Sequence, residues 1–222
     1  MAATERPVTL TAGALRRKDP VTVGPSPTEV GERLRERRKE LSLSVRELAR
    51  RVAVSPSLIS QIENGKTSPS VGTLYAIVSE MDLSLDEVFT GVGEPRRGGD
   101  GARDSRSPVV TEDERKEISL GSGVRWQRLT RAADPNVDFL HVIYESGGAS
   151  CPEDHLMRHV GQEYGYVISG RLSVTVGFDN YELTAGDSIS FDSTQPHRLA
   201  AMGDEPVHAI WTVVGRLGDP RL

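Results

Sequence analysis

The spacing of apolar residues changes once along this chain, and that change constrains the fold more than any other feature. Residues 26–91 place apolar side chains three and four positions apart, the period of a buried helix face. Residues 109–222 alternate short β-branched runs with Gly, Asp and Asn turns, which is typical of an all-β domain. Between them, residues 92–108 are rich in Gly, Arg, Asp and Ser and predict a flexible linker. Residues 1–25 are polar and lack periodicity, so we expect a disordered arm before two domains.

Serine marks five helix starts in the first domain. Ser26, Ser44 and Ser84 are each followed by glutamate three residues later, the spacing at which hydroxyl and carboxylate satisfy each other's backbone N–H groups. Ser55 and Ser70 supply the other two starts. The second and third helices would be joined by a turn at about residues 53–55, so we predict a five-helix bundle that contains a helix-turn-helix.

The charge of the chain is unevenly distributed. The formal net charge is −5, yet residues 33–66 carry nine Lys and Arg against four Asp and Glu, a net of +5. Residues 107–222 carry ten against seventeen, a net of −7. Because phosphate binding depends on the local field, the helical domain is the part predicted to bind DNA.

The stretch ELARRVAVSPSLISQIENGKTSPSVGTLYAIVSEMDLSLDEVF resembles the DNA-binding domain of the xenobiotic-response-element family, which has the lambda-repressor-like fold. The residues that carry this resemblance are Ala49, Ser55, Leu58, Ile59, Ser60, Glu63, Gly65, Pro69 and Leu74. It implies that the helix from Pro56 to Asn64 enters the major groove, where Gln61 would pair with adenine. The DNA-binding residues it implies are Arg46, Ser55, Ser57, Ser60, Gln61, Asn64 and Lys66, with Arg50 and the Arg37–Lys39 run as further phosphate contacts. The family often has Gln where this chain has Val45, so we transfer no base preference.

The second domain predicts strands in DFLHVIY, YGYVISG, RLSVTVGF, YELTAGDSISF, PHRLAAM and VHAIWTVV, a pattern that favours a double-sheet jelly roll. Its motifs resemble those of the cupin superfamily. His159 and Glu163 precede Gly170 at the spacing of the first cupin motif, and His197 follows Gly186 by eleven residues, as in the second. The fold class is therefore a multidomain α plus β chain with an all-β cupin barrel at its C-terminal end.

The resemblance to cupins implies a site inside the barrel. Cupin metal sites use His, His, Glu and His, but the first position here is Met157, which leaves His159, Glu163 and His197 for Fe, Mn, Ni or Zn. His155 would point inward as well if its strand extends that far. A metal-free pocket for an organic molecule is the alternative. The predicted ligand-binding residues are Met157, His159, Glu163, Tyr166, Phe191 and His197, with Trp211 as a further wall and Arg158, Arg171 or Arg198 as partners for a carboxylate.

These features together predict a cytoplasmic transcription regulator, more specifically a repressor, whose barrel binds a small-molecule effector. One recognition helix reads few base pairs, so we expect a homodimer, joined through the barrels, on a pseudo-palindromic operator with half-sites ~34 Å apart or a multiple of that. No apolar run approaches the ~20 residues of a membrane span. The single cysteine, Cys151, predicts a buried thiol, with a redox sensor as the alternative. The competing functions are a metal-dependent oxygenase or epoxidase, and a protein-interaction adaptor; no catalytic residue is predicted.

Overall fold

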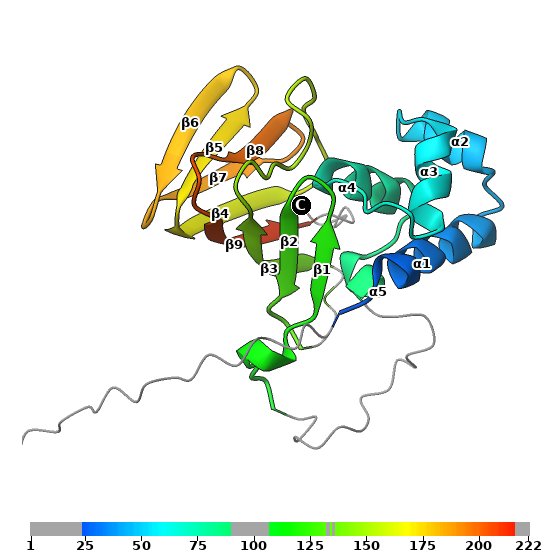
Figure 1. The fold of residues 1–222 in the computed structure, drawn as a ribbon, viewed down its shortest axis with the longest axis horizontal. Coiled ribbons are helices and arrows are strands. Elements are labelled where there is room, and N and C mark those ends of the chain that lie inside the picture. Colours follow the sequence, from blue (N-terminus) through cyan, green and yellow to red (C-terminus); the bar gives the residue numbers. More distant parts are fainter. Residues whose placement is uncertain (1–23, 90–106, 132–133, 135, 216–222) are drawn as a thin grey trace, which may run out of the picture.

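A computed structural model describes residues 24–89, 107–131, 134 and 136–215 of the 222-residue chain. The predicted arm and linker lie almost entirely outside these residues. Figure 1 shows the helices gathered on one side and the strands on the other. The five predicted helices are present as α1 (Pro27–Glu40), α2 (Val45–Arg51), α3 (Pro56–Glu63), α4 (Val71–Glu80) and α5 (Leu85–Phe89). No helix within the described ranges is long and apolar enough to cross a membrane.

Each helix begins where the serine pattern predicts. Ser26 caps α1 in a complete capping box with Glu29, and the hydroxyls of Ser44, Ser55 and Ser70 accept from the backbone N–H three residues on. Ser84 does the same for α5, since Glu87 N–H donates to its hydroxyl at 3.2 Å and its own N–H donates to the Glu87 carboxylate at 3.0 Å. The local sequence therefore determines where each of the five helices begins.

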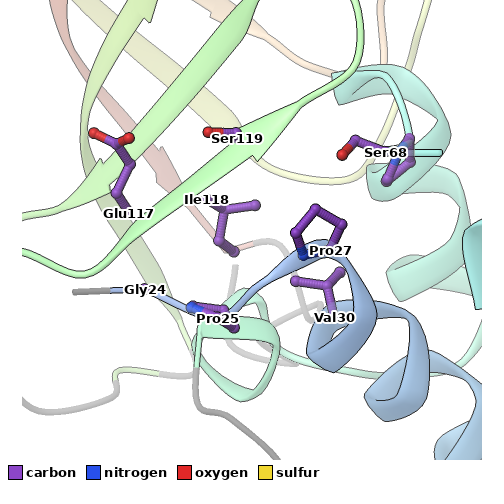
Figure 2. A pocket seen from close by; sticks show the side chains of 9 residues that line it. Gly24, Pro25, Pro27, Val30, Ser68, Glu117, Ile118 and Ser119 are labelled. Carbon is purple, nitrogen blue, oxygen red and sulfur yellow. The ribbon is translucent and has the colours of Figure 1, made fainter. Parts of the chain in front are cut away.

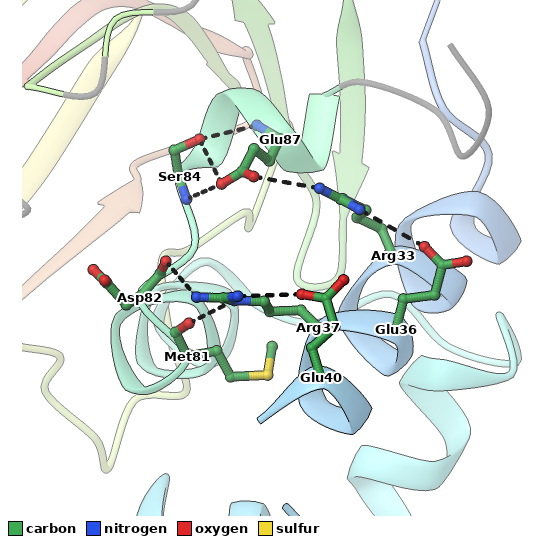
Figure 3. A network of polar contacts seen from close by, with 8 residues as sticks. All are labelled: Arg33, Glu36, Arg37, Glu40, Met81, Asp82, Ser84 and Glu87. Carbon is green, nitrogen blue, oxygen red and sulfur yellow. Dashed lines mark hydrogen bonds and ion pairs between the residues drawn. The ribbon is translucent and has the colours of Figure 1, made fainter. Parts of the chain in front are cut away.

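Arginines on α1 hold the helical domain together from inside. Arg38 is 7 % exposed and forms a bidentate pair with Glu63 of α3, with Nε–Oε1 at 2.5 Å and Nη2–Oε2 at 2.8 Å. Arg37 donates to the Met81 carbonyl at 3.0 Å, and Arg33 pairs with Glu87 at 3.3 Å, so that both tie α1 to the α4–α5 turn (Figure 3). The prediction that Arg38 contacts phosphate is therefore wrong, because its guanidinium group is buried against Glu63, whereas Arg37 is partly exposed and its phosphate contact stays a prediction.

The second domain is a two-sheet barrel. It comprises a short 3-10 turn, η1 (Glu112–Glu114), followed by β1 (Glu117–Leu120), β2 (Val124–Arg128), β3 (Val137–Tyr144), β4 (Gln162–Ser169), β5 (Arg171–Val176), β6 (Asp179–Thr184), β7 (Ser188–Asp192), β8 (His197–Ala201) and β9 (Val207–Val214). The larger sheet has the order β1-β2-β3-β9-β4-β7 and the smaller the order β6-β5-β8. This confirms the double-sheet prediction. Strands β1 and β2 were not individually predicted, because they are short and rich in polar residues.

The two domains pack directly against each other. Helix α4 is the helix nearest the barrel in Figure 1, whereas α2 and α3 lie on the side of the helical domain away from it. The Gly72 N–H donates to the Ser150 carbonyl at 3.0 Å, and the Gly121 N–H donates to the Pro69 carbonyl at 2.8 Å. One continuous hydrophobic cluster includes buried residues of both domains. The junction is therefore an ordered interface.

Two further contacts extend that interface. A buried ion pair joins Asp86 of α5 to Arg128 of β2, with Oδ1–Nη1 at 2.8 Å. A hollow of about 90 Å³ lies where the start of α1 meets β1, and Figure 2 shows Pro27 and Val30 lying next to Ile118 across it. The helical domain therefore contacts the barrel through α1, α4 and α5.

Candidate functional site

Helix α3 presents a polar face to solvent. Leu58, Ile59 and Ile62 face the bundle, which leaves the opposite side of this eight-residue helix to polar side chains. All seven residues predicted to bind DNA are exposed: Arg46, Ser55, Ser57, Ser60, Gln61, Asn64 and Lys66. The geometry thus brings a hydrogen-bonding surface and its flanking cations together on the outside of the helical domain.

The side chains on this face are also partly organised. The amide of Gln61 donates to the Ser57 hydroxyl at 3.4 Å, and the amide of Asn64 donates to the Ser60 carbonyl at 2.6 Å. An amide held extended on a helix surface can pair with the N6 and N7 edge of adenine. Ser55 caps the helix, so its hydroxyl is engaged with Leu58 N–H; because Pro56 has no N–H, the backbone N–H of Ser57 is the group of the first turn that suits a phosphate.

Of the cations near this face, Arg46 and Lys66 take part in none of the ion pairs found among the described residues. Arg50, another predicted phosphate contact, pairs with Glu47 at 2.8 Å. The same carboxylate accepts from Arg51, and together these arginines lower the pKa of Glu47 to about 2. Arg50 would have to leave this exposed pair to reach a phosphate, which costs little because such pairs are weak.

Inside the barrel, three ionisable side chains converge on one point. His159 Nε2 lies 2.9 Å and His197 Nε2 lies 3.1 Å from Glu163 Oε1, and all three residues are buried. None of these three atoms completes a hydrogen bond to any other group of the described chain. Buried polar atoms without partners are costly, so the cluster calls for a ligand or a proton that the surrounding protein does not supply.

The tautomers of the two imidazoles indicate which kind of ligand fits. His159 Nδ1 faces the Val160 carbonyl at 3.2 Å, and His197 Nδ1 faces the Gln195 carbonyl at 2.9 Å. A carbonyl only accepts, so each Nδ1 carries hydrogen, and a ring that is neutral turns the bare lone pair of Nε2 toward the carboxylate. Lone pairs then meet across about 3 Å unless a metal ion or a proton stands among them. These three residues could hold a divalent metal ion, with the carbonyls orienting the imidazoles as outer partners.

The carboxylate of the cluster is held in its ionised form. Burial works against ionisation of Glu163, but the hydrogen bonds and positive charge that His159 and His197 supply when protonated outweigh it, so the pKa of this carboxyl lies below its usual range. The indole N–H of Trp211 donates to the other oxygen, Oε2, at 2.6 Å. Gly165 makes this reach possible, since a Cβ there would stand 2.1 Å from the Trp211 ring.

The cavity beside this cluster is small and closed. Its volume is about 20 Å³, enough for about one water molecule or ion. Its walls are Val71, Tyr75, Trp126, Leu140, Val142, Tyr144, Met157, Glu163, Leu199 and Trp211. The structure thus places Met157, Glu163 and Trp211 where the sequence predicted them, and Phe191 packs on His197 with ring centroids 5.1 Å apart.

Several other residues that the sequence predicted to bind the ligand do not line the cavity. Tyr166 is 48 % exposed, because Glu163, Gly165 and Val167 take the inward positions of β4 and alternation sends Tyr166 outward. His155 does not extend a strand; its side chain is 68 % exposed and pairs with Asp154. The arginines proposed for a carboxylate do not line the cavity: Arg158 and Arg171 are exposed, and Arg198 donates to the Cys151 carbonyl.

Sequence reasoning missed the residues that the helical domain contributes to this cavity. Val71 and Tyr75 lie on α4, whose apolar stripe predicted only a bundle helix. The Tyr75 ring stacks on His159 with centroids 4.3 Å apart, and meets the edge of Trp126 at 5.4 Å. The sequence did contain a signal: α4 carries an aromatic residue, Tyr75, in addition to the aliphatic residues that pack into the core of the helical bundle.

Cys151 matches the simpler of its two predictions. The thiol is buried, and burial raises its pKa above the ordinary value. Its sulfur lies 3.1 Å from the His155 carbonyl, which accepts from it. A thiol with a raised pKa is a poor nucleophile, so this environment disfavours a redox sensor.

Comparisons with known proteins agree with this architecture. The family model described as a helix-turn-helix matches residues 34–88, and the one described as a cupin domain matches residues 140–213. The chain is 31 % identical over 170 residues to the HTH-type transcriptional regulator PuuR of Escherichia coli strain K12, which covers 77 % of this chain and 86 % of that protein. It is 23 % identical over 175 residues to the HTH-type transcriptional regulator SutR of the same strain, with 79 % and 88 % covered.

A solved structure shares the fold of both domains. The crystal structure of an HTH_3 family transcriptional regulator from Vibrio cholerae superposes with a TM-score of 0.60 at 24 % identity, over 85 % of this chain and 96 % of that one. At this identity the likeness speaks for the arrangement of the elements.

Proposed function

Since the chain belongs to the helix-turn-helix transcription regulators that carry a C-terminal cupin domain, we propose that it represses transcription by binding a pseudo-palindromic operator as a homodimer. It would work in the cytoplasm, and its barrel would sense a small molecule. The observation that carries the proposal is the polar outer face of α3, where Ser57, Gln61 and Asn64 stand exposed between cationic residues.

Two kinds of DNA contact are proposed for this surface. Gln61 would read adenine in the major groove, and Ser57, Ser60 and Asn64 would support that reading. Arg46, Lys66 and the N-terminus of α3 at Ser55 would hold phosphates and fix the register of the helix on the duplex. Because the phosphate contacts release counterions, binding should weaken steeply with salt.

We propose that the outer face of the larger sheet joins two copies of the chain. Register places Tyr164 of β4 beside Thr212 and Phe139, and Tyr166 beside Ile210 and His141. Tyr164, Tyr166 and Ile168 are about half exposed, and the two rows carry no Lys, Arg, Asp or Glu from β4 to β3; the second row continues through Gln127 of β2 to Glu117 of β1, at the edge of the sheet. Interface cores are depleted of charge and enriched in tyrosine. A second copy is the occupant we favour, because one eight-residue recognition helix reads too few base pairs alone.

For the barrel we propose a divalent metal held by His159, Glu163 and His197. A bound metal would supply a Lewis-acidic centre to which an effector's oxygen or nitrogen could attach. The protein's own part is to fix both imidazole tautomers, to keep Glu163 ionised and to exclude bulk water. Elemental analysis with native mass spectrometry, on protein purified without chelator or a metal-binding tag, tests this. A stoichiometric divalent metal is expected; a metal-free chain that carries an organic mass would instead make the barrel an organic pocket.

The alternative is a metal-dependent cupin enzyme. The position of Met157 beside the cluster speaks against it, because a thioether is a poor fourth ligand for the harder divalent ions. Turnover of a substrate by Fe(II)-loaded protein, lost together with His159 and His197, would establish the enzyme. An adaptor protein would instead co-purify with a stoichiometric partner.

The division of labour between the domains, with boundaries proposed at residues 26–91 and 109–222, is tested by deletion. A chain that lacks residues 107–222 should lose affinity for the full palindrome, because the barrels no longer hold two heads together. Its affinity for an isolated half-site should change little. Equal affinity of both proteins for the palindrome would show that the helical domain dimerises alone.

A further inference from the structure

The cavity of the barrel is completed by a side chain of the DNA-binding domain. Tyr75 of α4 is 4 % exposed and lies with its ring stacked on His159, planes inclined by 11°. Val71, one turn earlier, lines the same cavity. The remaining wall residues belong to the barrel, so the pocket is closed only while α4 is docked.

The closed cavity has no room for an organic molecule. A volume of about 20 Å³ holds one water molecule or one ion, whereas sites for organic ligands are at least ten times larger. A metal ion at His159, Glu163 and His197 is compatible with the docked helix. The Tyr75 ring covers one face of His159, so its withdrawal would open space for an organic effector next to the cluster.

Withdrawal of Tyr75 would move the whole reading head. Helix α4 is packed into the core of the helical domain, and only residues 64–70 separate it from α3. Its first turn also bonds to the barrel, through Gly72 N–H and the Ser150 carbonyl. Packed cores move as units, so undocking α4 changes the pose of α3 relative to the barrel and to a second head.

We propose that the effector site is shared by both domains, and that Tyr75 is the gate at which effector binding competes with docking of the DNA-binding domain. The slot that Tyr75 fills is bounded by the flat face of His159 and by Trp126, so the ligand it would take is an organic molecule with a planar ring. This inference rests on the proposed function in one respect, namely that the barrel senses an organic molecule.

The chain contains its own reporter for the gate. Its two tryptophans, Trp126 and Trp211, both line the cavity and are only 2 % and 5 % exposed. Quenching of tryptophan fluorescence by acrylamide therefore measures access to the cavity. In the full-length chain Tyr75→Ala should raise the quenching constant by about twofold or more, since a large-to-small change leaves a cavity behind. Tyr75→Phe and the exposed Tyr181→Ala should match the unmodified chain.

A substitution at Gly72 should open the same junction between the domains without changing Tyr75 itself. A Cβ at Gly72 would stand 3.3 Å from the Cβ of Met157 and 3.5 Å from that of Cys151, so Gly72→Val places a larger side chain against both. It should raise quenching as Tyr75→Ala does, and it keeps the test valid if Tyr75→Ala fails to fold. Quenching that stays at the level of the unmodified chain in a folded variant at either position would overturn the gate.

Phenol is the probe for the slot. It should raise the thermal unfolding midpoint of Tyr75→Ala, because it binds the vacated site of the folded protein, and leave Tyr181→Ala unchanged. The absence of a phenol effect on folded Tyr75→Ala would refute the planar slot. Measurements of DNA affinity test whether docking of α4 is coupled to DNA binding. Tyr75→Ala should change the affinity for DNA about threefold or more, while Tyr75→Phe should not. An unchanged affinity for DNA in a Tyr75→Ala protein whose cavity is open to quencher would refute the competition. If neither the variants nor the unmodified chain binds DNA, the proposed function fails. The quenching result still shows whether Tyr75 closes the cavity.

Discussion

The phenol ring of Tyr75, in the helical domain, lies face to face with the imidazole of His159, in the barrel, at a centroid distance of 4.3 Å. His159 is one of three buried side chains that converge inside the barrel, and Tyr75 sits on the helix next to the recognition helix. The helical domain and the barrel cavity thus share a wall, and the single contact of Tyr75 with His159 joins the helical domain to the buried cluster.

The Arg38–Glu63 pair is predicted to be the most sensitive polar contact of the helical domain. Arg38→Met leaves Glu63 buried without its partner, so we expect a loss of about 3–5 kcal/mol in the free energy of unfolding. Urea unfolding followed by helical ellipticity measures it. The control Arg50→Met removes an arginine with a side chain 72 % exposed and should cost less than about 1 kcal/mol. Similar losses in both variants would contradict the distinction.

Metal binding is predicted to depend on Glu163. Glu163→Gln removes the only carboxylate of the cluster, so the affinity for a divalent metal should fall by about 100-fold or more. Glu182→Gln, at an exposed glutamate on β6 of the smaller sheet, is the matched control and should bind as the unmodified chain does. Competition with a chromophoric chelator measures both. Retention of the metal by Glu163→Gln would show that it is held elsewhere.

Dimer formation is predicted to depend on the outer face of the larger sheet. Tyr166→Glu puts a charge at the centre of this uncharged surface, and we expect the dimer to weaken by about 10- to 100-fold. Sedimentation velocity over a range of concentrations would show it. Tyr181→Glu introduces the same charge on the smaller sheet and should leave the dimer intact. If Tyr166→Glu sediments like the unmodified chain, the interface lies on another face.

Stability is predicted to fall as the pH drops from about 6.5 toward 4. Burial, with added repulsion from His208, Arg115 and Arg125, lowers the pKa of His141 to about 4, while Glu112 opposes this weakly. The unfolded chain therefore binds more protons than the folded chain below pH 6.5, so this contribution is complete above that pH and is lost on acidification. His141→Gln should flatten the dependence by up to about 1 kcal/mol per pH unit in thermal or urea unfolding. The exposed His155→Gln should not, and an unchanged slope in His141→Gln would contradict the assignment.

The sequence predicts most of the fold because its signals are local. Serine caps and 3.6-residue spacing predict all five helices, and short β-branched runs between Gly, Asp and Asn turns predict β3 to β9. The inner cluster was also predictable, since His159, Glu163 and His197 sit at motif spacings. The face on which Tyr166 lies was predicted wrongly although a local rule was available: Tyr166 is three residues from Glu163 on β4, so strand alternation puts the two side chains on opposite faces of the sheet.

Two kinds of contact could not be predicted from the sequence: those between the two domains, and those of arginine side chains within the helical bundle. The wall formed by Tyr75, and the use of Arg37 and Arg38 inside the bundle, depend on tertiary packing across residues far apart in the chain. Periodicity reports which face of a helix is buried, but it does not say against which partner. For α4, one part of the apolar surface packs in the bundle and another part closes the barrel.

The most direct test of the account is selection from randomised duplex DNA by the full-length chain, followed by sequencing, in parallel with Gln61→Ala. We expect an enriched inverted repeat for the unmodified chain, with half-sites one helical turn apart or a multiple of that. Gln61→Ala should bind this repeat about 1–3 kcal/mol more weakly and lose the preference at one adenine of each half-site, with little change on random DNA. Recovery of no sequence above the starting pool by the unmodified chain, or equal loss on random DNA by Gln61→Ala, would contradict the claim that α3 reads an operator.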